Sequence, residues 1–232
     1  MDDKIKKDTE MVEHIKLIAR DTSLGPFIFG DFYRSGIRVE ETPLIIYVGG
    51  AISTEEYQLR ISTEPTPVVN EFLAAVRAES PGVDLLVLPF PPEPDGSVHQ
   101  ELFSILLFDL LRQTPNPRPS RIACLGYSIG ASFATYLTFS LPQVRALSVI
   151  GGYGMSEGAN ESRMVGDVIS RKYQAFWNAD SGGYMENLFF LHLLTKYDAE
   201  MEIVTASGGH DFVEYASNGS VRNAFEFVIK CL

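Results

Sequence analysis

Hydrophobic and polar positions along the chain alternate between short apolar runs and longer segments whose apolar residues recur with helical spacing. Four runs are apolar almost throughout, as expected of strands that are covered on both faces of a sheet. They are LIIYV (44–48), DLLVL (84–88), RIACL (121–125) and LSVI (147–150). Such runs, separated by helical segments, predict the centre of a mostly parallel sheet in an α/β protein.

The segments between these runs carry helical patterns and further strand patterns. In the last of them, SVRNAFEFVIKCL, the apolar residues fall on one helical face, so a closing helix is expected to pack on the sheet. We expect helices at 66–82, 97–113, 185–197 and 220–232, and further strands at 172–179 and 201–206. With helices as crossovers between parallel strands, both faces of the sheet should be covered.

The pattern of hydrophobic and polar positions is less regular in the first forty residues and at about 152–171. A helix is predicted near residues 9–20, followed by an antiparallel hairpin within GPFIFGDFYRSGIRVEETP (25–43) that leads into the first central strand. The polar stretch at about 152–171 is short, so it forms a small lid at most. We expect residues 1–232 to form one domain, because this length lies in the upper range of single domains.

Charge and cysteine content narrow the class of partner and compartment. The formal net charge of -11, with no cluster of Lys or Arg, disfavours nucleic acids and anionic membrane surfaces as partners. The chain begins with a charged segment that lacks the apolar region of a signal peptide, and no apolar run is long enough to span a bilayer. Cys124 and Cys231 are expected to be reduced thiols. A cytoplasmic location is therefore predicted.

The stretch RIACLGYSIGASFATYL (121–137) carries the main chemical signal. GYSIG (126–130) has the form Gly-x-Ser-x-Gly, and it stands between an apolar strand and a helical pattern. A strand-to-helix turn this sharp strains the serine backbone, and the flanking glycines leave room for it. The hydroxyl of Ser128 would then project from the carboxyl end of the strand as a nucleophile. A plain glycine-serine turn is the alternative.

A serine nucleophile needs a base, and His210 is the candidate. It lies in SGGHDF, directly after the last predicted strand, and the carboxyl ends of strands carry active sites in open α/β sheets. The other histidines, His14, His99 and His192, fall within predicted helices, where a structural role is expected.

The acid that orients the histidine is assigned to Asp180, which ends the preceding strand in FWNADSGG. Asp198 is excluded because it precedes the strand 201–206 and so lies at the wrong end, roughly 20 Å away at about 3.3 Å per residue. The carboxylate of Asp211 would have to bend back onto the imidazole of the preceding residue, His210, to act as this acid. The remaining alternatives are Glu157, Glu161 and Asp167.

The oxyanion formed during acyl transfer would be held by two backbone N–H groups. One is that of Ile129, at the start of the helix after the serine; the other is that of Ala51, with Gly50 as the alternative, in the loop YVGGAIST. The proline-rich loop 89–96 should border the pocket. Aromatic residues near these loops line the pocket or belong to the core, and they are Phe90, Tyr127 and Tyr153.

The order GYSIG, NADSGG, SGGHDF resembles the α/β-hydrolase superfamily over about residues 42–232, and in particular esterases related to enterochelin esterase and acetyl esterases. The resemblance implies ester hydrolysis by a triad of Ser128, Asp180 and His210. Two features depart from that pattern: Gly49-Gly50 stands in place of a His-Gly pair, and the insertion before Asp180 is short.

The sequence therefore predicts a serine hydrolase that cleaves the ester of a small or medium-sized molecule through an acyl-enzyme. A thioesterase or acyltransferase with the same triad is the first alternative, and a ligand-binding protein without hydrolytic activity is the second. No phosphate-binding loop, dinucleotide fingerprint or metal-ligand spacing appears, so neither a cofactor nor a metal is expected. No motif bears on the oligomeric state.

Overall fold

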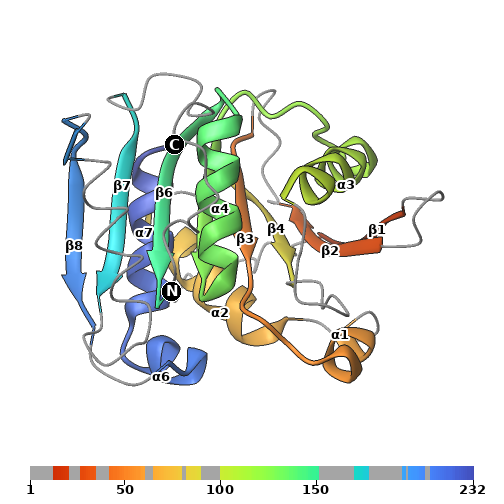
Figure 1. The fold of residues 1–232 in the computed structure, drawn as a ribbon, viewed down its shortest axis with the longest axis horizontal. Coiled ribbons are helices and arrows are strands. Elements are labelled where there is room, and N and C mark those ends of the chain that lie inside the picture. Colours follow the sequence, from red (N-terminus) through yellow and green to blue (C-terminus); the bar gives the residue numbers. More distant parts are fainter. Residues whose placement is uncertain are drawn as a thin grey trace, which may run out of the picture.

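A mixed eight-stranded sheet with helices on both faces forms the framework of the protein in a computed structural model (Figure 1). The structure describes residues 13–20, 27–34, 42–60, 65–79, 82–89, 100–151, 170–177, 195–196, 198–206 and 210–232. The strands lie in the order β1-β2-β4-β3-β5-β6-β7-β8. The pairs β1/β2 and β2/β4 are antiparallel, and all others are parallel.

The six strands from β4 to β8 in this order form the parallel part of the sheet. Their central members are buried along their whole length, which explains their continuous apolar sequences. The strands are β1 (Glu13–Arg20), β2 (Phe27–Arg34), β3 (Leu44–Val48), β4 (Asp84–Leu88), β5 (Ile122–Tyr127), β6 (Val144–Ile150), β7 (Lys172–Trp177) and β8 (Met201–Thr205).

The helices divide between the two faces of the sheet. Alternate side chains of the strands contribute to two cores, one closed by α3 and α4 and the other by α2, α6 and α7 (Figure 1). In β3, for example, Ile46 belongs to the first core and Ile45 to the second. The helices are α1 (Thr54–Arg60), α2 (Thr66–Glu79), α3 (Gln100–Gln113), α4 (Ile129–Ser140), α6 (Phe212–Ser217) and α7 (Ser220–Lys230).

The predicted α/β architecture is confirmed, and the six predicted strands correspond to β3 through β8. The helices expected at 66–82, 97–113 and 220–232 correspond to α2, α3 and α7. The short helices α1 and α6 were not anticipated. Most of the apolar segment 185–197, and residues 152–169 of the expected lid, lie outside the described residues.

The prediction of a helix near residues 9–20 is wrong for its described part, because residues 13–20 form β1. The side chains of Leu17 and Ala19 are buried, whereas that of Ile18 is exposed, which is the two-residue period of a strand. This strand is one of the two antiparallel partners of β2, with Leu17 opposite Gly30. Among the described residues, β2 therefore pairs with β1 and β4, and the predicted pairing within 25–43 is not seen, since pairing between segments outweighs local preference.

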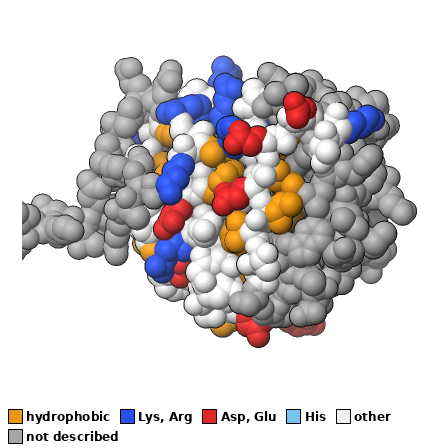
Figure 2. All heavy atoms as spheres, turned by 90° about the vertical axis from the view of Figure 1, so that its left-hand side faces the viewer, with side chains coloured by type: hydrophobic (Ala, Val, Ile, Leu, Met, Phe, Trp, Pro, Cys, Tyr) orange, Lys and Arg blue, Asp and Glu red, His pale blue; other side chains and the backbone are white. Residues whose placement is uncertain are grey.

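The edge strands of the sheet are β1 and β8, and β8 lies on the side of the molecule that faces the viewer in Figure 2. Apolar side chains lie there among acidic and basic ones, and Ile203 is exposed. Lys172 of β7 forms an ion pair with Glu200, just before β8. Charged groups of this kind discourage pairing with the edge of another sheet.

Candidate active site

Ser128 occupies a strained turn between β5 and α4. Its backbone has φ 55° and ψ -131°, in a region that residues other than glycine rarely adopt. The turn is held by hydrogen bonds on both sides: the Ser128 N–H donates to Ile150 O (3.1 Å), and the Ala131 N–H donates to Ser128 O (2.9 Å). Strain that the surrounding structure maintains in this way is typical of functional sites.

The two glycines of GYSIG allow the backbone segments around this serine to touch. A Cβ at Gly130 would lie 2.2 Å from Gly49 O, and a Cβ at Gly126 would lie 2.5 Å from the Cα of Ala131. Neither contact is possible for a residue with a side chain. The first turn of α4 can therefore pack directly on the end of β3.

His210 lies next to this serine, although 82 residues separate the two positions. The hydroxyl Oγ of Ser128 is 2.7 Å from Nε2 of His210, which is a hydrogen-bonding distance. Ser128 is 9% exposed, whereas His210 is exposed on the outer side of the contact. Ser128 follows β5 and His210 follows β8, and the carboxyl ends of these parallel strands lie at the same end of the sheet, with β6 and β7 between them.

Tyr127 connects the serine turn to the histidine. Its hydroxyl donates a hydrogen bond to the main-chain carbonyl of His210 (2.8 Å), and its ring stacks against the imidazole at a centroid distance of 5.7 Å. Burial, followed by the nearby carboxylate of Asp211, raises the pKa of the Tyr127 phenol to about 12. The phenol therefore stays protonated, and remains a donor, throughout the neutral range.

Asp211, the carboxylate nearest in sequence to His210, caps a helix. Asp211 is the N-cap of α6, and its side chain accepts a hydrogen bond from the Val213 N–H (2.9 Å). Asp198 precedes β8, at the opposite end of that strand from His210, as the sequence predicted. The first candidate, Asp180, and the alternatives Glu157, Glu161 and Asp167 lie outside the described residues.

The loop after β3 lies against the serine from the other side. A Cβ at Gly50 would be 3.1 Å from the Cβ of Ser128 and 3.0 Å from the ring of Tyr127. Ala51 follows in the same loop, and Ile129 is the first residue of α4. The loop and the helix start, which carry the two predicted N–H donors, therefore both adjoin Ser128.

A cavity of about 280 Å³ is lined by residues that adjoin Ser128 and His210, although neither of these two lines it. Its near end is formed by Gly50, Ala51, Tyr127 and Asp211, and it extends past β3 and β4 to β2. Two of the aromatic residues predicted to line a pocket, Phe90 and Tyr153, lie outside the described residues; Tyr127 lines this cavity. The other lining residues are Phe29, Asp31, Tyr47, Gly49, Ile52, Glu56, Arg60, Pro65, Pro67, Val68, Val87, Leu88, Pro89 and Phe212.

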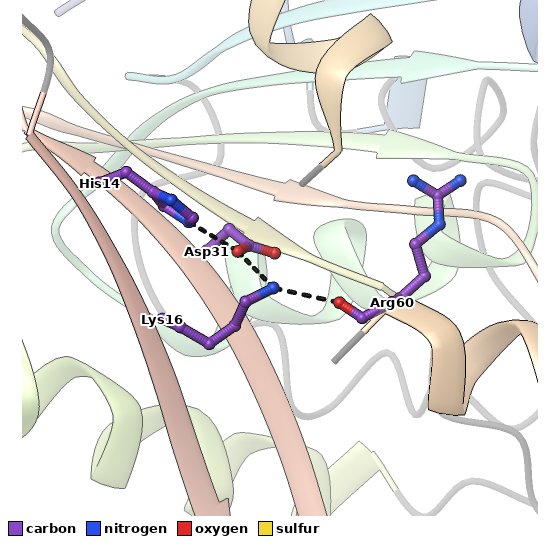
Figure 3. A network of polar contacts seen from close by, with 4 residues as sticks. All are labelled: His14, Lys16, Asp31 and Arg60. Carbon is purple, nitrogen blue, oxygen red and sulfur yellow. Dashed lines mark hydrogen bonds and ion pairs between the residues drawn. The ribbon is translucent and has the colours of Figure 1, made fainter. Parts of the chain in front are cut away.

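A group of charged residues at the far end of the cavity was not predicted from the sequence. Oδ1 of Asp31 is 2.8 Å from Nε2 of His14 and 2.6 Å from Nζ of Lys16, and Lys16 also donates to the main-chain carbonyl of Arg60 (Figure 3). His14 thus has the structural partner expected for it, but on a strand rather than a helix. In the sequence, the one feature that pointed to this charged group was a single aspartate, Asp31, inside the apolar segment FIFGDFYR.

Metal-binding clusters and membrane-spanning helices are both absent from the part of the chain that the structure describes. No three His, Cys, Asp or Glu side chains gather there as a metal site would require. No helix in that part has both the length and the apolar character needed to cross a bilayer.

No protein-family model and no curated protein matches the sequence. Solved structures, in contrast, match its fold over nearly the whole chain. A ferulic acid esterase aligns with a TM-score of 0.70 and 12% identity, over 96% of this chain and 100% of its own. The esterase LipW from Mycobacterium marinum aligns with a TM-score of 0.63 and 13% identity, over 95% of this chain and 83% of its own.

An S-formylglutathione hydrolase from Staphylococcus aureus aligns with a TM-score of 0.62 and 12% identity, over 94% of this chain and 99% of its own. At such identities the likeness concerns the fold. The sheet order, the helices on both faces and these alignments together show that the chain adopts the α/β-hydrolase fold.

Proposed function

We propose that the protein is a serine hydrolase that cleaves carboxylic esters through a covalent acyl-enzyme. One observation carries the proposal: the Oγ of Ser128, on a backbone held at φ 55°, lies 2.7 Å from the Nε2 of His210. A hydroxyl becomes a nucleophile when an adjacent base removes its proton. The fold of esterases found in the structural comparison is consistent with this chemistry.

In the proposed reaction, His210 takes the Ser128 proton as Oγ attacks the ester carbonyl. The tetrahedral intermediate then collapses, the alcohol leaves with a proton from His210, and the acyl group remains on Ser128. A water molecule activated by the same histidine releases the acid and restores the serine. We assign Asp180 the role of orienting the imidazole and stabilising its protonated form.

The negative oxygen of the intermediate would be bound by the N–H groups of Ile129 and Ala51, with Gly50 as the alternative to Ala51. Ile129 is the first residue of α4, and unpaired N–H groups at a helix start favour negative charge. The close approach of the Gly50 loop to Ser128 supports the second assignment.

Thioester hydrolysis is the second candidate, because the same attack on a carbonyl serves both substrates. One neighbour in fold carries the name S-formylglutathione hydrolase. Acyl transfer to an acceptor other than water uses the same acyl-enzyme, and a ligand-binding protein of this fold would form none.

Labelling with a fluorophosphonate probe tests the proposal. We expect the intact protein to be labelled and the Ser128→Ala variant to lose the label together with its turnover of p-nitrophenyl esters. Ser132→Ala, four residues further along the same stretch, is the matched control and should be labelled normally. Unlabelled intact protein would favour the ligand-binding alternative, and comparison of acyl esters with acyl thioesters separates the two hydrolytic candidates.

A further inference from the structure

The cavity lined by Gly50, Tyr127 and Asp211 runs along one face of the sheet, across the strands, and ends at the buried carboxylate of Asp31. It runs from Tyr127 on β5 past Tyr47 on β3 and Val87 on β4 to Asp31 on β2. The register places Asp31 opposite Val87, and Val87 opposite Tyr47. From β5 to β2 there are three strand spacings, about 14 Å at roughly 4.8 Å each. The two ends of the cavity therefore differ in chemistry and lie well apart.

Between its two ends the cavity is lined mainly by apolar side chains. Phe29, Tyr47, Val68 and Val87 are all buried, and proline residues complete the wall. A polar chain crossing this stretch would lose its hydration without gaining partners. The portion of a ligand that lies here must therefore be apolar.

At the far end, Asp31 presents a carboxylate with spare capacity to accept hydrogen bonds. The residue is only 2% exposed, and both its contact with His14 and its contact with Lys16 use the oxygen Oδ1. In Figure 3 no dashed line reaches the second carboxylate oxygen. A carboxylate has about four sites for accepting hydrogen bonds, so a ligand donor can be added here.

The charge balance at this end selects the kind of donor. Lys16 already neutralises Asp31 at 2.6 Å, so an ammonium group would meet a second positive charge beside the same carboxylate. A carboxylate group would meet the negative charge of Asp31, and Arg60, a cation that also lines the cavity, is already paired with Glu56. A neutral hydroxyl satisfies Asp31 without either repulsion.

We propose that the cavity binds an ester whose apolar portion ends in a neutral hydroxyl group, and that Asp31 accepts the hydrogen bond from that hydroxyl. The inference rests on the proposed ester hydrolysis and adds the class of substrate. An extended chain advances about 1.2 Å per bond, so ten bonds span about 12 Å, and the hydrogen bond to Asp31 adds about 2.7 Å. The hydroxyl should therefore lie roughly ten bonds from the reacting carbonyl. Lys16 holds Asp31 in place and, through the carbonyl of Arg60, holds the end of α1, which forms part of the cavity wall.

The experiment compares p-nitrophenyl esters of ω-hydroxydecanoate, its methyl isostere undecanoate, and ω-aminodecanoate. We expect kcat/KM to be about tenfold higher for the hydroxyl compound than for either of the other two, because its hydrogen bond goes to a charged acceptor. The six-carbon ω-hydroxy ester is too short to reach Asp31 and should show no such advantage over its isostere. A second series, with the same groups on the alcohol side of acetate esters, covers the opposite orientation of the ester.

A double variant links any preference to Asp31. Replacing Asp31→Leu together with Lys16→Met substitutes an apolar pair for the ion pair and leaves no uncompensated charge. Within this variant we expect undecanoate to be preferred over ω-hydroxydecanoate, whatever the absolute rate. The matched control is Glu13→Gln with Arg34→Gln, which removes an exposed ion pair between the same two strands and should keep the wild-type ratio.

Binding without turnover separates failure of this inference from failure of the proposed function. Calorimetry on the wild-type protein compares octane carrying hydroxyl groups at both ends with octane carrying one. The diol buries less apolar surface, so tighter binding of the diol, lost in the Asp31→Leu, Lys16→Met variant, supports the hydroxyl site even if no ester is hydrolysed. The proposed hydroxyl site would be overturned if the methyl or ammonium compound were preferred over the hydroxyl compound in both ester series and in the binding measurement.

Discussion

The hydroxyl of Tyr127 donates to the main-chain carbonyl of His210, and its ring stacks on the same imidazole, with an angle of 21° between the ring planes. Tyr127 directly precedes Ser128, so one short segment carries the proposed nucleophile and also supports the proposed base. The position of the imidazole relative to the serine is therefore set partly by the residue next to that serine.

We expect Tyr127→Phe to lower kcat/KM for p-nitrophenyl butyrate by about five- to tenfold, because it removes one hydrogen bond worth about 1 kcal/mol and keeps the stacked ring. Since the Tyr127 pKa is raised to about 12, the loss should be constant between pH 6 and pH 9, as the phenol is protonated throughout. Tyr136→Phe, about two turns along α4 from Ser128, is the control. Unchanged kinetics in Tyr127→Phe would contradict a supporting role.

The two aspartates near His210 in the sequence should differ sharply in effect. Asp180→Asn is expected to lower kcat by about 10³- to 10⁴-fold, because an amide no longer stabilises the protonated imidazole. Asp211→Asn should stay within a few-fold of the wild type, since asparagine also caps a helix well. The measurement is kcat of both variants by steady-state kinetics. A larger loss in Asp211→Asn than in Asp180→Asn would assign the role of the acid to Asp211.

Gly130→Ala is predicted to destabilise the fold severely. The added Cβ would lie 2.2 Å from Gly49 O and 2.4 Å from Val48 O, so the start of α4 or the end of β3 must move. Overpacking of this kind costs about 1–3 kcal/mol or more. Gly219→Asn is the control: its φ is +83°, which asparagine tolerates, and no atom lies within 4 Å of the new Cβ. Urea denaturation of both variants provides the comparison, and equal midpoints would argue against the close contact.

The stability of the protein should fall in alkali, partly through Cys124. Burial raises the pKa of this thiol to about 12, whereas an unfolded cysteine titrates near 8.5. Between these values the unfolded chain releases a proton that the folded chain keeps, so the free energy of unfolding decreases as pH rises. Each such group contributes at most about 1.4 kcal/mol per pH unit.

Denaturation curves between pH 9 and pH 10.5 should therefore show a shallower decrease for Cys124→Ala than for the wild type. Cys231→Ala serves as the comparison: burial raises the pKa of that thiol too, but the thiol is only partly buried, so the slope should change less than in Cys124→Ala. In the native wild type, a thiol reagent should modify Cys231 and leave Cys124 unmodified until urea is added. Rapid modification of both thiols without denaturant would show that β5 opens readily.

Much of the α/β core could be predicted from the sequence, because local patterns report local environments. The apolar run 44–48 coincides with β3, and 84–88 coincides with β4, since strands buried on both faces need apolar residues at every position. The strained turn at Ser128 was also predictable, because the pattern Gly-x-Ser-x-Gly stands between a strand and a helix. In the structure, both glycines meet backbone atoms that leave no space for a Cβ. The roles of Asp180, Phe90 and Tyr153 stay predictions.

The tertiary structure alone decided how distant segments meet. The local sequence pattern of residues 13–20 favours a helix. These residues form the strand β1 because they pair with β2. The same pairing places Lys16 beside Asp31, and the next pairing places Asp31 opposite Val87, at the end of the cavity. Local periodicity shows which face of an element is buried, whereas the partner and the register depend on contacts between segments far apart in the chain.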